Sequence, residues 1–288
     1  MPELPEVETI RSGLEPIVGV EIRDCRVRRR DVVRDQWLDN SVHRRGPIEP
    51  GSLLVGASVV RLERKGKQLA LIGSNGRVIV IQLGMSGQVG LTSATKIPNA
   101  KHVHIVWILR NGQRMFFRDT RRFGGIVLYR TLKAHEHAWS RLGPDALNIS
   151  TKDLQRALSR TQRAIKVALL DQHLLAGVGN IYADESLFDA GINPFCISDA
   201  LEHKQVVRLA GSIRKILARA IKARGSTLRD YRDTDAQPGS AQLEHMVYAR
   251  AGQPCLVCGT TLRSTRMAQR ITCWCPRCQP ACTEQESE

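Results

Sequence analysis

The sequence predicts an α+β protein in which a mostly β half comes first, a helical half follows, and a small cysteine-rich hairpin comes last. Three observations predict this order. Segments rich in Val and Ile fill the first half and are separated by Asn-Gly pairs, apolar residues recur at helical spacing after Gly143-Pro144, and six of the eight cysteines fall between Cys255 and Cys282. A length of 288 residues is enough for two domains, each with its own core.

The chain is predicted to open with a helix. Pro5 suits the first helical turn, where its missing N–H would have had no partner. Val7, Ile10, Leu14 and Ile17 follow at the spacing that places apolar side chains on one helix face.

Residues 20–130 are predicted to form mostly antiparallel strands, arranged as a sandwich or a barrel. Asn75-Gly76 and Asn111-Gly112 are typical of tight hairpin turns, whose two central residues need a positive φ. The segment 35–52 contains two Gly/Pro pairs and is interpreted as a surface insertion. The strands are expected within Val59–Ile72, Arg77–Leu83, Val103–Leu109, Arg114–Arg118 and Ile126–Tyr129.

The second half is predicted to be helical. Apolar residues at helical spacing indicate a helix over 154–169, and Gly177-Val178-Gly179 interrupts the pattern. Asn180 is of a residue type that caps helices, so we expect it to cap the next one. A long basic helix is predicted over 201–224, and a polar loop over 225–240.

The cysteines near the C-terminus have the spacing of a metal site. Cys255, Cys258, Cys275 and Cys278 form the pattern C-x2-C-x16-C-x2-C. Two such pairs let four thiolates converge on one Zn²⁺ across a β-hairpin, and a site with four protein ligands is structural. Cys273 and Cys282 are spare, and their simplest interpretation is a packed thiol and a tail thiol.

Charge indicates the class of partner. Lys and Arg number 43 and Asp and Glu 28, which leaves a net charge of +15 and favours a polyanion. Aromatic residues make up only 5%, which argues against a stacking platform for single strands and for a duplex held through its phosphates. Because no apolar run is long enough for a membrane span and the N-terminus lacks an apolar signal region, we expect a soluble intracellular protein.

The N-terminus itself offers a nucleophile. Removal of Met1 would expose Pro2 as a secondary amine beside Glu3 and near Glu6. A secondary amine forms a cationic iminium with a sugar aldehyde, which acidifies the next carbon and allows a phosphate to be eliminated, while a carboxylate shuttles protons. The same residues would also suit a plain helix N-terminus with acids in its first turn.

Several motifs together make this chain resemble bacterial formamidopyrimidine-DNA glycosylases. They occur in the family's order along the chain, apart from the 35–52 insertion and the tail. The motifs are Met1–Thr9 (MPELPEVET), Gly66-Lys67, Leu83–Gly87 (LGMSG), Arg121–Gly124 (RRFG), Gly177–Tyr182 (GVGNIY) and the four-cysteine pattern.

The resemblance implies a mechanism. Pro2 would attack the sugar carbon that carries the damaged base, Glu3 would transfer protons at the sugar, and Glu6 would support it. Lys67 would contact phosphate and assist the first elimination, and Arg270 the second. Alone, Lys67 would be interpreted as a solvated lysine at a strand end and Arg270 as a hairpin charge.

The resemblance also implies how the duplex is opened. Met85, Arg121 and Phe123 would fill the void left by an extruded nucleotide; alone, Met85 and Phe123 would more often be core residues. The loop over 225–240 would cover the extruded base. Further DNA-binding residues would be His102, Arg163, Asn180, Glu185 and Tyr248, together with Arg121.

The family implies four parts. These are a β-sandwich catalytic domain over 1–143, a helix–two-turn–helix DNA-binding domain over 144–245, a zinc finger over 246–282 and an acidic tail over 283–288. The expected partner is damaged double-stranded DNA, bound by a monomer in the bacterial cytoplasm near the nucleoid, with one structural Zn²⁺.

Two alternative functions stay open. An endonuclease VIII-like enzyme would use the same chemistry on oxidised pyrimidines, but that branch usually has Gly where this chain has Leu4 and lacks the set of Met85, Arg121 and Phe123. The other alternative is a zinc-dependent DNA-binding protein without lyase activity.

Overall fold

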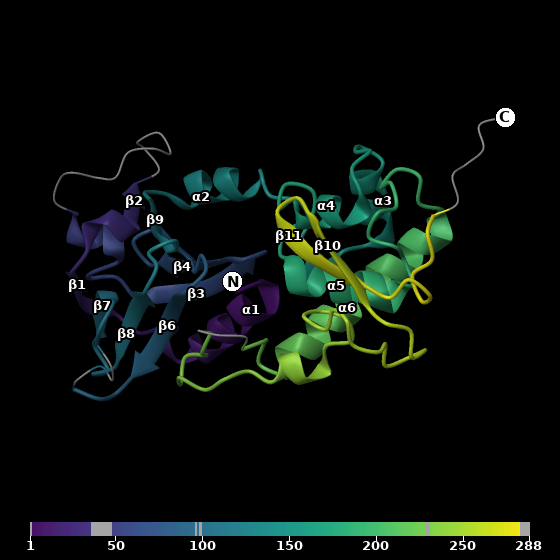
Figure 1. The fold of residues 1–288 in the computed structure, drawn as a ribbon. Helices are drawn as coiled ribbons and strands as arrows, with labels where there is room; N and C mark the ends of the chain where they lie inside the picture. Colours follow the sequence, from purple (N-terminus) through teal and green to yellow (C-terminus); the bar gives the residue numbers. More distant parts are fainter. Residues whose placement is uncertain (1, 36–47, 96, 98–99, 228–230, 283–288) are drawn as a thin grey trace. The chain divides into compact units, whose positions relative to one another are not determined.

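The computed structural model describes residues 2–35, 48–95, 97, 100–227 and 231–282. They form two compact units (Figure 1). The N-terminal unit comprises the described parts of 1–141 and 223–242, and the C-terminal unit those of 142–222 and 243–288. The chain therefore leaves the first unit at residue 142, forms helices of the second unit up to residue 222, and returns to the first unit over 223–242. Most of the predicted 35–52 insertion, 36–47, lies outside the described residues, as does the tail 283–288.

The N-terminal unit contains two β-sheets. One has the strand order β1-β7-β8-β6 and the other β2-β9-β5-β4-β3. The strands are β1 (Ile22–Val27), β2 (Val33–Asp35), β3 (Val59–Lys65), β4 (Gln68–Gly73), β5 (Val78–Gln82), β6 (Gly87–Thr92), β7 (Val103–Leu109), β8 (Arg114–Asp119) and β9 (Gly125–Tyr129).

A single apolar core joins the two sheets, so the arrangement is a sandwich rather than a barrel. Leu71 and Ile79 of the five-stranded sheet share this core with Trp107 and Phe117 of the four-stranded sheet. Among the described strands, all neighbours are antiparallel except β2, which pairs parallel with β9. The predicted antiparallel character is therefore correct for every pair but this one.

Turns connect the strands at the two predicted Asn-Gly positions, with one addition. Gly76 and Gly112 have φ of 74° and 87° in the β4–β5 and β7–β8 turns, but the expected positive φ at both central residues is wrong, because Asn75 and Asn111 do not adopt it. The stretch 59–72 does not run as one strand. Gly66, with φ of 55°, folds it into the hairpin β3–β4 and places Lys67 in the turn.

The N-terminal helix α1 (Leu4–Gly13) has Pro5 in its first turn, as predicted. It ends before Leu14 and Ile17, which anchor a following 3-10 turn in the same core. A second helix, α2 (Leu132–Trp139), begins with the Thr131 hydroxyl accepting the Ala134 N–H at 3.2 Å.

The C-terminal unit is built from helices and one hairpin. The elements are α3 (Thr151–Leu158), α4 (Ile165–Leu170), α5 (Asn180–Ala190), α6 (His203–Lys222), β10 (Arg263–Met267) and β11 (Arg270–Trp274). The short 3-10 helices of the two units span Glu15–Ile17, Arg30–Val32, Pro50–Leu53, Ala146–Asn148 and Ala241–Glu244.

Two predictions about these helices are wrong in detail. The segment 154–169 forms two helices, because the mostly polar stretch 159–164 between α3 and α4 has no large apolar residue to continue the stripe. Asn180 does not cap α5. Gly179 is the N-cap, with extended backbone, and Asn180 is the first helical residue, its amide directed to β11 instead.

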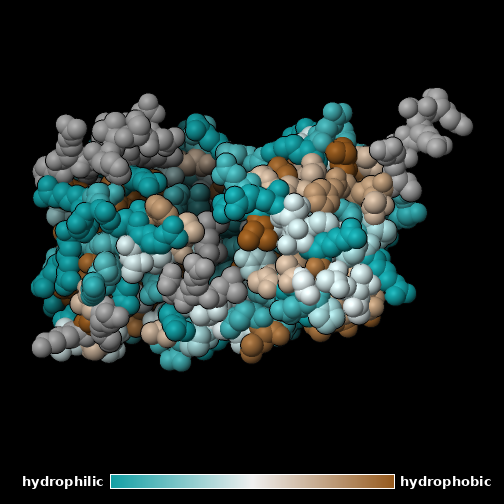
Figure 2. Space-filling view, viewed as in Figure 1, coloured by the Kyte–Doolittle hydropathy of each residue, from teal (hydrophilic) through white to brown (hydrophobic). Residues whose placement is uncertain are grey.

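On the face drawn in Figure 2, hydrophilic residues predominate and apolar ones form separate small patches. Among the described residues, the exposed large apolar side chains include Met85 and Phe123. No helix in the described part of the chain combines the length and apolar character that a membrane crossing requires.

Candidate functional site

The N-terminal residues are buried and held by a reciprocal capping box. Pro2 is buried, and Glu3 and Glu6 are 3% and 1% exposed. Glu3 is the N-cap of α1, where its side chain accepts the Glu6 backbone N–H. The Glu6 carboxylate in turn accepts the Glu3 N–H at 2.7 Å. Two acids thus satisfy the free amides of the helix end, and the residue beside Pro2 is fixed in place.

Glu6 also binds the returning segment 223–242. Its Oε1 accepts the Ser226 N–H at 2.7 Å, and its carbonyl accepts the Tyr231 hydroxyl at 3.3 Å. Burial raises the pKa of Tyr231, so this hydroxyl stays a neutral donor. Gly225 has φ of +80°, and a Cβ there would lie 2.8 Å from Glu6 Oε1. The sequence gives no signal for these partners of Glu6, because it indicates only that a loop begins at Gly225.

Lys67 lies half-buried in the β3–β4 turn, on the hairpin that receives α1. Arg64 of β3 donates its Nε–H to Glu8 of α1 at 2.6 Å, and Arg64 is 6% exposed at the side chain. A second arginine, Arg11, donates to the same carboxylate at 2.8 Å. The Arg64–Glu8 pair fixes the helix that begins after Glu3 on the strand that ends before Lys67, and Arg11 holds the Glu8 carboxylate from within the same helix.

The two loops predicted to fill the void lie together. A Cβ on Gly84 would come within 2.4 Å of the Gly124 nitrogen, so the loop that carries Met85 touches the loop that carries Phe123. Met85 is 38% and Phe123 55% exposed, and the Arg121 guanidinium lies 4.7 Å from the Phe123 ring centre. These side chains therefore project from the fold rather than into its core.

A buried carboxylate joins these loops. Asp119 is fully buried and accepts the Ser86 hydroxyl at 2.5 Å and the Gly124 N–H at 2.8 Å. Ser86 in turn accepts the Arg121 N–H at 3.0 Å. Neither Asp119 nor Ser86 was predicted, because the two residues that meet here lie 33 positions apart in the chain.

His102 is exposed, with a left-handed φ of 63°, and lines a surface hollow of about 580 Å³. The lining carries charges of both signs: Lys101, Arg118 and Arg232 are cations, and Asp233 and Asp235 are acids. The cations are of the kind that contact phosphate groups.

In the C-terminal unit, Arg270 is exposed at the start of β11, directly after a two-residue turn. Ala268 and Gln269 form that turn with φ of 45° and 60°. The adjacent carbonyl of Ile271 accepts two side-chain donors, Lys166 Nζ at 3.0 Å and Asn180 Nδ2 at 2.9 Å. Asn180 therefore positions the hairpin of Arg270.

A buried ion pair lies behind the same strand. Lys166 of α4 and Asp184 of α5 are 0% and 2% exposed, and their charged atoms are 2.7 Å apart. Asp184 also accepts the Cys273 N–H at 3.1 Å. Burial raises the pKa of Asp184 to about 7, although the Lys166 ammonium opposes that rise.

Glu185 holds the start of the cysteine-rich segment. It is 2% exposed and accepts the backbone N–H groups of Met246, Val247 and Tyr248, each at 2.8–2.9 Å. The Glu185 carboxylate is therefore bound to the backbone of 246–248, and through it fixes the position of the half-buried Tyr248. Arg163, by contrast, is exposed and pairs with Asp171 at 2.9 Å.

The predicted metal ligands converge. The sulfur atoms of Cys255, Cys258, Cys275 and Cys278 all lie within 4.8 Å of one another, with Cys258–Cys275 at 3.5 Å and Cys255–Cys278 at 3.9 Å. A tetrahedral ion with Zn–S bonds of about 2.3 Å needs S···S separations of roughly 3.8 Å, so the cluster fits zinc.

The two spare cysteines differ. Cys273 is buried in the small core of the finger, as a packed thiol should be. The interpretation of Cys282 as a tail thiol is wrong, because it forms a disulfide with Cys196. Their separation of 86 residues gives no local signal.

Comparison with known proteins matches three stretches of the chain to family models. Residues 1–126 match the formamidopyrimidine-DNA glycosylase N-terminal domain and residues 142–232 the H2TH domain of the same enzymes. Residues 252–281 match the zinc finger found in FPG and IleRS.

Relatives that match nearly the whole chain carry the same family name as the matching models. The formamidopyrimidine-DNA glycosylases of Xanthomonas campestris pv. campestris and Laribacter hongkongensis are 40% and 39% identical over 284 residues, which is 97% of this chain and all of theirs. The crystal structure of the MutM (FPG) protein of Thermus thermophilus superposes with a TM-score of 0.81 at 37% identity, covering 96% of this chain and 98% of that one. A Lactococcus lactis FPG mutant in complex with Fapy-dG-containing DNA has a TM-score of 0.84 at 31% identity, covering 97% and 100%.

Proposed function

This chain belongs to the formamidopyrimidine-DNA glycosylase family, and on that basis we propose that it excises oxidised purines from duplex DNA and then cleaves the abasic strand. The expected substrates are 8-oxoguanine and formamidopyrimidines. The observation that carries the catalytic part is the N-terminal capping box, which fixes Glu3 beside Pro2 while Glu6 secures the segment 223–242.

In the proposed reaction, the Pro2 amine bonds to C1′ and displaces the damaged base, while a proton from Glu3 opens the sugar ring. The resulting iminium acidifies the C2′ proton, so the 3′ phosphate leaves by β-elimination and the 5′ phosphate by δ-elimination. Hydrolysis of the remaining iminium frees Pro2. Lys67 and Arg270 stabilise the departing phosphates.

The other predicted residues take supporting roles in this proposal. Met85, Arg121 and Phe123 fill the void, as their exposure and the contact between Arg121 and Phe123 permit. His102, Arg163, Asn180, Glu185 and Tyr248 serve DNA binding, with Asn180 and Glu185 acting through the chain segments they hold. The zinc ion holds the two ends of the finger together and so gives the hairpin of Arg270 a fixed shape.

The organisation and setting are proposed to follow the family. We retain four parts over 1–143, 144–245, 246–282 and 283–288, with the segment 223–242 of the second part packed on the first compact unit. We propose that the protein acts as a monomer on damaged duplex DNA in the bacterial cytoplasm near the nucleoid.

Excision assays test the substrate class. Duplexes with 8-oxoguanine should be cut much faster than duplexes with thymine glycol, because Leu4 and the set of Met85, Arg121 and Phe123 differ from the endonuclease VIII pattern. Faster cutting of thymine glycol would instead assign the protein to that pyrimidine-directed branch.

Borohydride trapping tests the nucleophile. The purified protein, shown by intact mass to begin at Pro2, should form a covalent adduct with an abasic duplex. Pro2→Gly should lose most of this adduct, and the matched change Pro5→Ala, within the first turn of α1, should keep it. Absence of any adduct from the unmodified protein would leave only the zinc-dependent DNA-binding alternative.

A further inference from the structure

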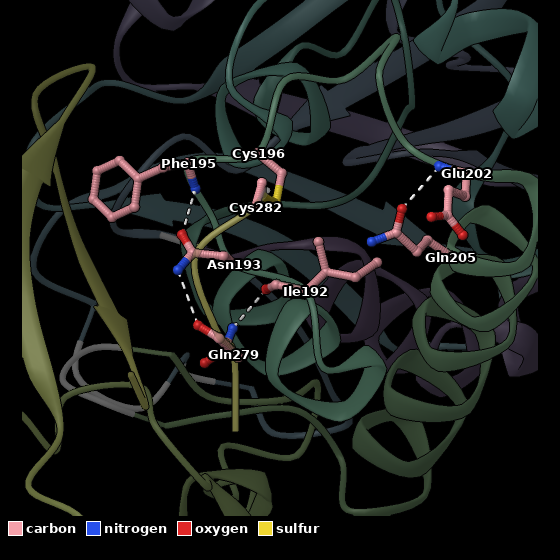
Figure 3. Close-up of a disulfide and its surroundings, with 8 residues drawn as sticks. All are labelled: Ile192, Asn193, Phe195, Cys196, Glu202, Gln205, Gln279 and Cys282. Carbon is pink, nitrogen blue, oxygen red and sulfur yellow. Dashed lines mark hydrogen bonds between the residues drawn. A yellow bond between two sulfur atoms is a disulfide. The ribbon is translucent and has the colours of Figure 1, made fainter. Parts of the chain in front are cut away.

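A disulfide joins two segments of the C-terminal unit that the predicted chemistry does not use. Cys196 lies in the loop after α5, and Cys282 lies four residues beyond Cys278, the last zinc ligand (Figure 3). Their Cα atoms are 5.6 Å apart, within the usual range for a disulfide. The bond therefore attaches the end of the finger to the helical part of the same unit.

Hydrogen bonds already hold Gln279, three residues before Cys282, and Gln279 is 1% exposed. Its carbonyl accepts the Asn193 amide at 2.9 Å, and its own amide donates to the Ile192 carbonyl at 2.8 Å (Figure 3). Its Oε1 accepts the Cys275 N–H at 3.0 Å. Gln279 thus links the loop after α5 directly to a zinc ligand, and the disulfide secures the segment 279–282 that contains it.

The two cysteine residues differ in exposure. Cys196 is 5% exposed, and its carbonyl accepts the Ile165 N–H at the start of α4 at 2.7 Å. Its neighbour Phe195 packs edge-on against Trp274 of β11, with ring centres 5.1 Å apart. Cys282, in contrast, is exposed. One end of the bond is therefore anchored in a packed loop and the other faces solvent.

A surface hollow of about 670 Å³ borders the bond. Both cysteines line it, together with Ile192, Glu202 and Gln205. This volume lies in the range of small-molecule sites, roughly 300–1,000 Å³. A low-molecular-weight thiol therefore has room beside the bond and an exposed residue, Cys282, to approach.

We propose that Cys196 and Cys282 are a site of reversible exchange with a low-molecular-weight thiol and its disulfide, and that the oxidised form slows the loss of metal from the four-cysteine cluster. The physical reason is that the segment 279–282 contains both Gln279 and Cys282. When the hydrogen bonds of Gln279 break, the backbone next to Cys275 and Cys278 becomes free to move, and the disulfide opposes that local unfolding.

The exchange is balanced in electrons. A small thiolate attacks Cys282 Sγ, so a mixed disulfide forms there and the Cys196 sulfur leaves as thiolate. A second thiolate attacks the small-molecule sulfur of that mixed disulfide and releases Cys282. Two small thiols are thereby oxidised to one disulfide, and two electrons reduce the protein; oxidation runs through the same steps in reverse.

The first test titrates the zinc-loaded, full-length protein with a tripeptide thiol and its disulfide. In disulfide-rich buffer, peptide mapping should find Cys196 linked to Cys282 and the zinc ligands unmodified. In thiol-rich buffer both residues should react with an alkylating reagent. Two free thiols at these positions under oxidising conditions, or a bond that no thiol concentration reduces, would overturn the proposal.

The second test measures zinc transfer to a chromogenic chelator under oxidising conditions. Cys196→Ser, Cys282→Ser and the double variant should each release zinc at least about threefold faster than the unmodified protein, and to the same extent, because either change removes the same bond. Cys25→Ala, at a free cysteine of the N-terminal unit, is the matched control and should not change the rate.

Release of zinc from all three variants at the unmodified rate would overturn the proposed effect on the metal. Phosphine reduction of the unmodified protein, followed by removal of the reductant, gives a route that needs no substitution and should reproduce the faster rate. Neither measurement uses DNA, so failure of this inference is separate from failure of the proposed glycosylase.

Discussion

At the scale of single residues, four buried acids hold the candidate site in shape, because their carboxylate oxygens accept hydrogen bonds from backbone N–H groups. Glu6, Asp119, Asp184 and Glu185 are each at most 2% exposed, and each accepts backbone N–H groups. Burying a carboxylate costs free energy unless hydrogen-bond donors satisfy it. Each of these acids therefore binds donors of another chain segment and links that segment to its own. The candidate site is held in shape by these residues.

The cost of burying a carboxylate can be tested at Asp184 by measuring how the unfolding free energy changes with pH. Its pKa of about 7 in the folded protein exceeds the ordinary value near 3.8, because burial disfavours the charged form. Between those two pH values the folded state holds a proton that the unfolded state has lost, so this group's contribution to stability falls as pH rises. Relative to Asp184→Asn, the unmodified protein should lose unfolding free energy from about pH 4 to pH 7 and show no further change above that window.

Denaturant unfolding at several pH values measures this difference. Asp153→Asn, at an exposed carboxylate on α3 of the same unit, is the control and should not give a difference of that sign. A difference for Asp184→Asn that grows in the opposite direction would mean that the Lys166 ammonium outweighs burial.

At the scale of elements, α1 and the segment 223–242 behave as one structure. The helix supplies Glu6, and the segment supplies the Ser226 N–H and the Tyr231 hydroxyl. Thr234 packs so closely on α1 that a Cβ on Gly13 would overlap its side chain. The segment expected to cover the extruded base is therefore attached to the helix that begins beside Pro2, the proposed nucleophile.

Gly225→Ala should disturb that attachment. A φ of +80° and the 2.8 Å approach to Glu6 both oppose a Cβ, so the unfolding free energy should fall by roughly 1–3 kcal/mol. Excision of 8-oxoguanine should slow more than cleavage of a preformed abasic site, which has no base to cover. Single-turnover rates on the two duplexes measure this.

Gly211→Ala is the matched control, in the interior of α6 with no atom within 4 Å of the new Cβ. It should leave both rates unchanged and stabilise the protein by up to about 1 kcal/mol. Equal losses on the two duplexes for Gly225→Ala would argue against a role of this segment in base recognition.

At the scale of the whole molecule, charge and metal act together. The net charge of +15 favours any polyanion, but the finger determines where one strong cation, Arg270, is presented. Arg270 lies on the strand that leads to Cys275, so the hairpin should lose its shape when the metal is removed.

Removal of zinc with a chelator should therefore abolish specific binding to a duplex with an abasic-site analogue, measured by fluorescence anisotropy at fixed salt. Arg270→Ala with zinc retained is the comparison, and it should still bind while producing less δ-elimination product. Unchanged binding after the metal content has been shown to fall to zero would contradict this prediction.

Features with a local cause could be predicted from the sequence. The spacing of Cys255, Cys258, Cys275 and Cys278 brings four thiols together whatever the rest of the fold does. The Asn-Gly turns and the proline in the first turn of α1 express conformational preferences of single residues, and they lie where predicted. The order of β half, helical half and finger follows from changes in composition along the chain.

Only the tertiary structure decided which distant residues meet. Ser226 binds Glu6 across 220 positions, Asp119 binds Ser86 across 33, and Cys282 bonds Cys196 across 86. Asn180 and Lys166 converge on the carbonyl of Ile271 in the same way. Such contacts leave no periodicity or spacing in the sequence, because packing of the completed core, rather than any local preference, brings their partners within reach.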